Sequence, residues 1–252
     1  GALGTVLTRI AEFMERSKDL KETVKSALVY PAILVLVAVV SVVVLLIFVV
    51  PQFTQMFEES GKALPLPTQI VIAAGEFFQA WWWALIGGSL ALFILFRRQM
   101  ADPDSRYRWD DRFLALPLVG DLIAKIEMAR FSRTLGTLLD NGVSLLGALS
   151  IVKETMNNSV MADRLDEVAT KLREGKGLGA PLMEAEVFPR LGVHMVMVGE
   201  ETGRLSEMLI QVADVFDREV QTAVKRTLSL LEPALILGLG LVIGAIIMSI
   251  LV

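Results

Sequence analysis

The chain of 252 residues contains no cysteine and only one histidine. Disulfides, thiolate nucleophiles and cysteine-based zinc sites are therefore excluded, and so is a metal site built from several histidines. An excess of basic residues is missing too, because 24 Lys and Arg stand against 28 Asp and Glu, for a formal net charge of -4. This balance gives no reason to expect nucleic-acid binding. We expect no metal and no cofactor.

Charged residues are also absent from three long apolar runs, which lie within 26–57, 77–96 and 233–252. About 20 apolar residues in a helix cross the ~30 Å hydrocarbon core of a bilayer. We therefore predict transmembrane helices at 29–50, 79–97 and 232–252. The first run could also suit a buried strand, although strands rarely exceed about ten residues. The second, which contains three consecutive tryptophans, could also be a buried core helix.

Basic residues close to the apolar runs predict the orientation of the chain. They precede the first run, follow the second and precede the third: Arg16, Lys18, Lys21 and Lys25, then Arg97 and Arg98, then Lys225 and Arg226. Basic residues next to membrane spans favour the cytoplasmic side. Residues 1–28 and 98–231 are therefore expected in the cytoplasm, and the 51–78 loop and the end of the chain outside it.

Residues 98–231 carry helix signals and little sign of strands. Asn141-Gly142 is typical of a helix end, and Ser144 can cap a helix that continues to about Thr155. Gly177, Gly179 and Pro181 suggest a loop. The predicted helices lie at about 122–139, 144–155, 159–174, 182–185 and 189–199, with a last one from about 205 into the third span. The predicted fold class is therefore all-α: a polytopic membrane protein with three transmembrane helices and a cytoplasmic six-helix-type bundle.

The two ends of the chain resemble each other. A shift of 202 residues gives ten identities in 50 positions, including Gly1 with Gly203, Arg16 with Arg218 and Pro31 with Pro233. Such an internal repeat makes residues 1–28 the expected final helix of a first cytoplasmic domain whose beginning is missing.

Few residues suggest chemistry. Gly175–Gly179 resembles a phosphate-binding loop only faintly, since it lacks the spacing of that motif, and a plain turn is the better interpretation. His194 has no neighbouring histidine or cysteine, so a structural or interfacial role is favoured over metal binding. Gly240 and Gly244 form a Gly-x-x-x-Gly pair that would permit close helix packing in a membrane.

The turn at Gly199, Glu200, Glu201, Gly203 and Arg204 is the candidate docking site. One interpretation is a solvated cap between two helices, in which carboxylates satisfy helix-end amides. The other is a corner that binds a partner or holds a divalent cation together with another helix. Glycine tolerates the positive φ that a tight turn requires, and the acidic pair offers charge for a basic partner surface.

Several motifs resemble those of a known family. They are ARFSRTLGTLLDNGVSLLGAL (129–149), FPRLGVHMVMVGEETGRL (188–205), VPQFTQMF (50–57), LPLPT (64–68) and LEPALIL (231–237). Together they resemble the inner-membrane platform protein of type II secretion and type IV pilus machines, the F-protein family. The motif positions that we single out are Arg130, Phe131, Arg133, Gly142, Pro189 and Pro233. Ser144 stands where the family has proline, and serine can still start a helix.

The resemblance implies a scaffold and not an enzyme. Its expected partners are a cytoplasmic assembly ATPase, other inner-membrane secretion components, pilin-like subunits, the lipid bilayer and further copies of the chain. It leaves open whether the machine secretes proteins or builds a pilus. A transporter or channel subunit is a more distant alternative, because such proteins usually carry polar groups within their spans, and here the first and third runs have only Ser41 and Ser249.

Overall fold

The computed structural model describes residues 29, 30, 32–44 and 66–251. This part of the chain is helical and contains no strand, which confirms the all-α prediction. Residues 29, 30 and 32–44 are helical. The following helices are α3 (Leu66–Ala101), α4 (Pro103–Ala115), α5 (Val119–Asp140), α6 (Leu145–Thr155), α7 (Ser159–Arg173), α8 (Gly179–Glu184), α9 (Arg190–Glu201) and α10 (Leu205–Leu251).

Three predictions fall wholly or partly outside the described residues. They are the final helix of a first domain at 1–28, part of the 29–50 span, and the 51–65 part of the outer loop. The remaining part of that predicted loop, 66–78, is helical and belongs to α3. The helix therefore begins earlier than the uncharged run suggests. Pro67 lies in its first turn, where a helix tolerates proline.

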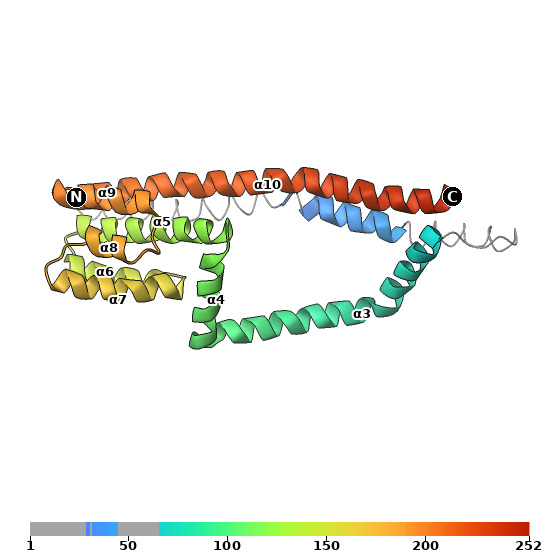
Figure 1. Ribbon diagram of the computed structural model, residues 1–252, viewed down its shortest axis with the longest axis horizontal. Helices are drawn as coiled ribbons and strands as arrows, with labels where there is room; N and C mark the ends of the chain where they lie inside the picture. Colours follow the sequence, from blue (N-terminus) through green and yellow to red (C-terminus); the bar gives the residue numbers. More distant parts are fainter. Residues whose placement is uncertain (1–28, 31, 45–65, 252) are drawn as a thin grey trace, which may run out of the picture. The chain divides into compact units, whose positions relative to one another are not determined.

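The chain divides into two compact units. Unit 2 comprises Phe96–Ala223, and unit 1 comprises Gly1–Leu95 together with Val224–Val252. Within unit 2, α5, α6, α7, α9 and the first part of α10 run along a common direction, and α4 runs across it (Figure 1). The helices α3 and α10 each contribute residues to both units.

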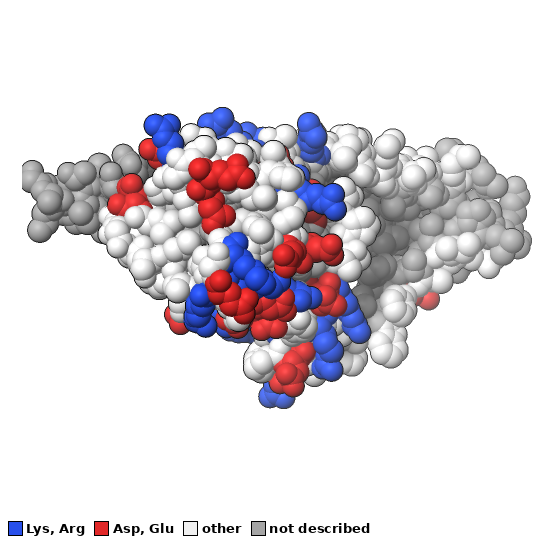
Figure 2. Space-filling view, turned by 60° about the vertical axis from the view of Figure 1, so that its left-hand side comes forward, with Lys and Arg blue, Asp and Glu red and all other residues white. Residues whose placement is uncertain are grey.

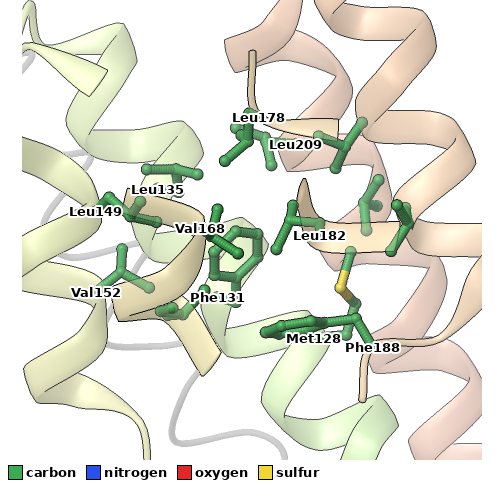
Figure 3. Packing of buried hydrophobic residues seen from close by; sticks show 14 of the residues in the cluster. Met128, Phe131, Leu135, Leu149, Val152, Val168, Leu178, Leu182, Phe188 and Leu209 are labelled. Atoms are coloured by element: carbon green, nitrogen blue, oxygen red, sulfur yellow. The ribbon is translucent and has the colours of Figure 1, made fainter. Parts of the chain in front are cut away.

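Unit 2 has a continuous apolar core. Phe131 of α5 lies at its centre and is fully buried, with its ring 5.5 Å from that of Phe188 between centroids. Figure 3 shows side chains from five helices and two connecting segments pointing into this core: Met128, Phe131, Leu135, Leu149, Val152, Val168, Leu178, Leu182, Phe188 and Leu209. Burial of such apolar surface is the main stabilising term in folding.

Local capping signals determine several helix ends in unit 2. The Ser144 side chain accepts a hydrogen bond from the Gly147 N–H, and α6 ends at Thr155, as predicted. Gly142 follows α5 with a φ of +80°, a conformation that glycine adopts at little cost. Asn158 caps α7 by accepting from the Met161 N–H. These ends need no tertiary contact to be specified.

Two features of unit 2 differ from the prediction. Helix α4 is not among the predicted helices; Asp102 caps it by accepting from the Ser105 N–H, and proline occupies its first position. Helix α8 spans Gly179–Glu184 and not 182–185, so Gly179 and Pro181 lie within the helix and not in a loop. A Cβ at Gly179 would lie 2.3 Å from Met197 Cγ, so the glycine is needed there for close packing.

Aromatic contacts fix the join between α3 and α4. The Trp109 ring lies 5.6 Å from the Phe96 ring and 5.7 Å from the Phe113 ring, measured between centroids. Its indole N–H donates to Gln99 Oε1 at 3.2 Å. These residues all belong to unit 2, so the last turns of α3 are part of its structure.

Two glycines allow close packing against the first turns of α10. A Cβ at Gly136 of α5 would lie 3.1 Å from both Leu209 Cβ and the Ser206 carbonyl oxygen. A Cβ at Gly199 of α9 would lie 2.7 Å from Met208 Cβ. Helix α10 then continues through Pro233 to Leu251, as the absence of a break in the sequence predicts.

The described helices of unit 1 expose their apolar side chains. Leu92 on α3 is 69% exposed and Leu241 on α10 is 74% exposed. Among the residues that the structure describes, no helix combines the length and hydropathy required to cross a membrane. The three predicted spans therefore stay predictions.

Candidate functional site

The turn between α9 and α10 contains the predicted docking residues. Gly203 has a φ of +69°. The Arg204 N–H donates to the Gly199 carbonyl at 2.9 Å, and the Gly203 N–H donates to the Glu200 carbonyl at 3.3 Å. This pair of bonds is the Schellman motif, which satisfies the last carbonyls of a helix and places glycine in the left-handed region. Gly203 therefore has the backbone role that the sequence predicts.

Gly199 has a different role from the predicted one. It lies within α9 and is buried, and it is not among the described glycines with positive φ. Its missing Cβ makes room for Met208. Gly199 therefore brings α9 and α10 together, whereas Gly203 alone supplies the positive φ of the turn.

Glu200 points back into unit 2. Its Oε1 accepts from the Leu178 N–H at 2.6 Å and its Oε2 from the Gly179 N–H at 2.9 Å. A Cβ at Gly177 would lie only 2.5 Å from Oε1. The carboxylate therefore satisfies amides at the start of α8, and its interactions are internal.

Glu201 and Arg204 are the exposed charges of this turn. Arg204 Nε lies 3.9 Å from Glu207 Oε2, and both of these side chains are about two-thirds exposed. Such an exposed pair contributes little to stability. These groups can therefore meet a partner without loss of internal contacts.

One face of α9 continues the exposed surface of the turn. Leu191, His194 and Val198 share this face at helical spacing, and all three are exposed. His194 therefore lies at the surface between two apolar side chains. In the view of Figure 2, acidic and basic side chains are mingled, with uncharged surface between them.

Arg133, a motif position, joins α5 to α10. Its Nη2 donates to Asp214 Oδ1 at 2.8 Å and to Asp217 Oδ2 at 2.7 Å. Burial acts to lower the pKa of Arg133, yet the hydrogen bonds to the two aspartates raise it on balance. Arg133 thus stays charged and holds α5 against the part of α10 that belongs to unit 2.

Arg130, the neighbouring motif position, pairs with a buried carboxylate. Its Nη1 lies 2.9 Å from Glu127 Oε1, and Glu127 also accepts from the Asn157 N–H at 3.1 Å. Burial raises the pKa of the Glu127 carboxyl, and the charge of Arg130 opposes that rise. This pair connects α5 to the turn before α7.

Side chains of α4 also form hydrogen bonds to the turn before α7. Asp110 is buried and accepts from both the N–H and the hydroxyl of Ser159, at 2.8 and 2.6 Å. Arg106 donates to the Asn157 carbonyl at 2.6 Å. Two buried carboxylates, one from α4 and one from α5, therefore converge on the start of α7.

The other motif positions are structural in the described residues. Phe131 is a core residue, Gly142 ends α5, and Pro189 precedes the first residue of α9. No described atom outside the helix backbone lies within 4 Å of a Cβ built at Gly240 or Gly244. Close helix packing at that pair stays a prediction.

The described residues contain no group of three or more side chains that could hold a metal ion. Gly175 and Gly177 both have positive φ and lie in the connection between α7 and α8, which fits the interpretation of a plain turn. The divalent-cation interpretation of the Glu200-Glu201 turn is not supported, because Glu200 accepts two backbone N–H groups.

The connection between α4 and α5 is not among the features predicted from the sequence. The residues that connect α4 to α5 and the first residue of α5 are all exposed and apolar: Leu116, Pro117, Leu118 and Val119. Leu118 has a positive φ of 71°. A proline followed three residues later by glycine is the available sequence signal for a tight turn here.

Comparisons with known proteins agree with the motifs. The family described as "Type II secretion system (T2SS), protein F" matches residues 1–51 and 131–252. The type II secretion system protein F of Xanthomonas campestris is 41% identical over 254 residues, covering 100% of this chain and 62% of that protein. The type IV pilus assembly protein PilC of Myxococcus xanthus is 38% identical over 244 residues, covering 97% and 58%.

A third relative, the type IV pilus assembly protein PilC of Thermus thermophilus, is 38% identical over 248 residues, covering 98% of this chain and 61% of that protein. The chain thus spans about three-fifths of the length of these relatives. The family match includes Arg133, Pro189 and the α9–α10 turn. The chain belongs to the type II secretion system protein F family.

Proposed function

We propose that this chain is part of a non-enzymatic inner-membrane platform in a type II secretion machine. The platform would couple a cytoplasmic assembly ATPase to the extraction and polymerisation of pilin-like subunits. The observation that carries the proposal is the similarity of nearly the whole chain to proteins named for type II secretion and type IV pilus assembly. A chromosomal deletion complemented with the full-length gene tests it, and unchanged secretion and piliation in the deletion strain would contradict it.

The equivalent platform of a type IV pilus is the second candidate. It has specific support, because relatives with pilus names match at 38% identity and a relative with a secretion name at 41%. The same deletion strain separates the two candidates. Loss of an exported enzyme with normal pili favours secretion, and loss of pili with normal export favours the pilus.

The membrane arrangement is part of the proposal. Three spans at 29–50, 79–97 and 232–252 would place residues 1–28 and 98–231 in the cytoplasm. The exposed apolar side chains of α3 and α10 support this arrangement, because large apolar surfaces need a partner or lipid. A reporter enzyme fused after Lys62 should be active on the periplasmic side, and activity confined to the cytoplasm would overturn the assignment.

We also propose that the α9–α10 turn binds the assembly ATPase. Glu201 and Arg204 would make the polar contacts, and the apolar face with Leu191 and Val198 would pack beside them. Gly199, Glu200 and Gly203 would shape the turn from within. Binding that depends on Glu201 should weaken as salt rises, because salt screens exposed charges.

Glu201→Lys tests this docking role in a pull-down of the ATPase by the full chain. Asp163→Lys is the matched control, since it reverses an exposed carboxylate on α7. Loss of binding in the first variant alone supports docking at the turn. Equal binding by both variants, in proteins that melt like the parent, would remove Glu201 from the interface.

The remaining expected partners follow from the same proposal. Other inner-membrane components, pilin-like subunits and further copies of the chain would meet it in the membrane, where Gly240 and Gly244 could pack against another helix. Crosslinking from a cysteine placed beside Gly240 would test self-association.

A further inference from the structure

The connection between α4 and α5 contains a strained turn. Leu118 has φ +71° and ψ −49°, and the Val119 N–H donates to the Pro117 carbonyl at 2.9 Å. These values define a γ-turn in the form that is rare because its central residue is strained. Leucine has no polar side chain that could offset this strain with a local hydrogen bond, so the surrounding structure must hold it.

The neighbouring residues hold this turn in place. The Gly120 N–H donates to the Leu116 carbonyl at 2.8 Å, and the Leu122 N–H donates to the Leu118 carbonyl at 3.1 Å. A Cβ at Gly120 would lie 2.0 Å from the carbonyl oxygen of Leu114. Only glycine fits at 120, and α4 and α5 therefore fix the turn from both sides.

The fixed turn presents an apolar side chain to the outside. Leu118 is 87% exposed, and its neighbours Leu116 and Val119 are 46% and 44% exposed. Exposure of a leucine in a strained conformation gains nothing for the folding of unit 2. Strain kept in this way points to a function.

The turn lies at the end of unit 2 where α10 leaves it. Helices α5 and α10 run antiparallel, because Gly136 packs on Leu209 whereas Lys125 lies 2.9 Å from Glu219. From Lys125 back to Val119 the helix rises about 9 Å, which leads toward Ala223, the last residue of unit 2. Helix α4 separates this turn, at its C-terminal end, from α3, which precedes its N-terminal end.

We propose that Leu118 inserts into the cytoplasmic interface of the bilayer as an anchoring point of unit 2. This inference rests on the proposed membrane function, in which the apolar runs of α3 and α10 cross the lipid. Lipid is the favoured occupant because α10, which leaves unit 2 at the same end as the turn, continues into one of those runs. Transfer of an exposed leucine side chain and its aliphatic neighbours from water into the bilayer interface is favourable.

The absence of cysteine makes the test direct. Single-cysteine variants of the full chain, reconstituted in phosphatidylcholine vesicles, carry a nitrobenzoxadiazole label at Leu118→Cys, Leu92→Cys or Leu191→Cys. Leu92 lies in the apolar run of α3 and reports on the proposed span, and the exposed Leu191 on α9 is the aqueous control. Doxyl-labelled lipid should quench the labels at 118 and 92 and leave the label at 191 unchanged.

The outcomes separate the inference from the proposed function. Quenching at 92 with none at 118 overturns the inference and leaves the membrane function standing. Absence of quenching at both positions overturns the membrane function itself. A label at 118 that shifts to the blue without lipid quenching is covered by protein, and this result also overturns the inference.

Leu118→Gly provides an independent variant. Glycine accepts the φ of this position without strain, so the melting temperature should stay the same or rise. A label at Leu116→Cys should nevertheless lose its lipid quenching when Leu118 is replaced. Unchanged quenching in this double variant would overturn the anchoring role, and a large fall in melting temperature would overturn the assignment of strain.

Discussion

Leucine side chains in the core of unit 2 are buried, whereas most of those in the described part of unit 1 are exposed. In unit 2, Leu135 and its neighbours are fully buried among side chains from several helices, whereas Leu92 and Leu241 in the described part of unit 1 are mostly exposed. The two units share apolar residue types and helical structure. What differs is the interleaving of charge, because unit 2 has charged residues on nearly every helix and the long runs of unit 1 have none.

Apolar composition alone does not make a core. Unit 2 combines apolar helix faces with capped ends and with ion pairs and hydrogen bonds that join different helices. Uniformly apolar helices have no preferred face, and they need lipid or other helices around them. The proposed membrane location supplies that surrounding for α3 and α10.

We expect the largest change in stability when an aspartate is placed in the core of unit 2, and none when it is placed in an apolar run of unit 1. Leu135→Asp buries a carboxylate in the core of unit 2 and should cost about 4 kcal/mol or more. Leu138→Asp should cost less, because Leu138 is only partly buried. Leu92→Asp should leave the melting of unit 2 unchanged. Circular dichroism can monitor thermal melting of each variant of the full chain in detergent. Equal melting temperatures for Leu135→Asp and the parent would contradict the assignment of Leu135 to the core.

Loss of the ion pairs that Arg133 makes between α5 and α10 should have the next largest effect on stability. Arg133→Ala leaves Asp214 and Asp217 without their shared cation and should lower the free energy of unfolding by about 2 kcal/mol. Arg133→Lys keeps the charge but replaces the guanidinium, whose Nη2 makes both hydrogen bonds, by a shorter side chain with an ammonium group, so its loss should be smaller. Denaturant unfolding measures both, and a loss in Arg133→Lys as large as in Arg133→Ala would show that geometry matters more than charge.

The adjacent carboxylates Glu200 and Glu201 should differ in their contribution to stability. Glu200→Gln keeps one acceptor oxygen but places an NH2 donor against the other backbone N–H group, so it should cost at least about 1 kcal/mol. Glu201→Gln removes an exposed charge and should change stability by less than about 0.5 kcal/mol. The same unfolding experiment serves for both. Similar losses would mean that Glu200 does not hold the start of α8.

The smallest predicted effect is the dependence of stability on pH that Glu127 causes. The pKa of Glu127 is raised above its ordinary value of 4.5 by burial, so the folded state holds this proton more tightly than the unfolded state. The stability that this contributes is present below about pH 4.5 and is lost as pH rises through the folded-state pKa. The stability of the parent should therefore fall relative to Glu127→Gln as pH rises from 4 toward neutrality. A difference between the two that does not vary with pH would contradict the raised pKa.

Much of unit 2 could be predicted because its signals are local. Ser144 and Asn141-Gly142 specify helix ends through bonds that span a few residues. Helix α4 is harder to predict, since it is short and polar and its apolar residues give no clear stripe, although Asp102-Pro103 is a typical helix start. The extent of α8 depends on contacts with α9, which the local sequence does not contain.

The candidate site could be predicted only in part for the same reason. The positive φ of Gly203 is a local property, and the motif predicts it. The inward direction of Glu200 depends on Leu178, which lies 22 residues earlier in the chain. The exposure of Leu118 likewise depends on how α4 and α5 meet. Tertiary packing, which a single sequence does not display, decides both.

The two glycines beside α10 have a mechanical consequence. Gly136 and Gly199 receive Leu209 and Met208, which are adjacent residues of α10, from two different helices. Rotation by one residue, about 100°, or sliding by about 1.5 Å would move these side chains out of their recesses and against backbone. The packing of these two side chains therefore fixes the rotation and the axial position of the first turns of α10 against the bundle. A torque applied to the bundle would turn the helix with it, without slippage at this contact.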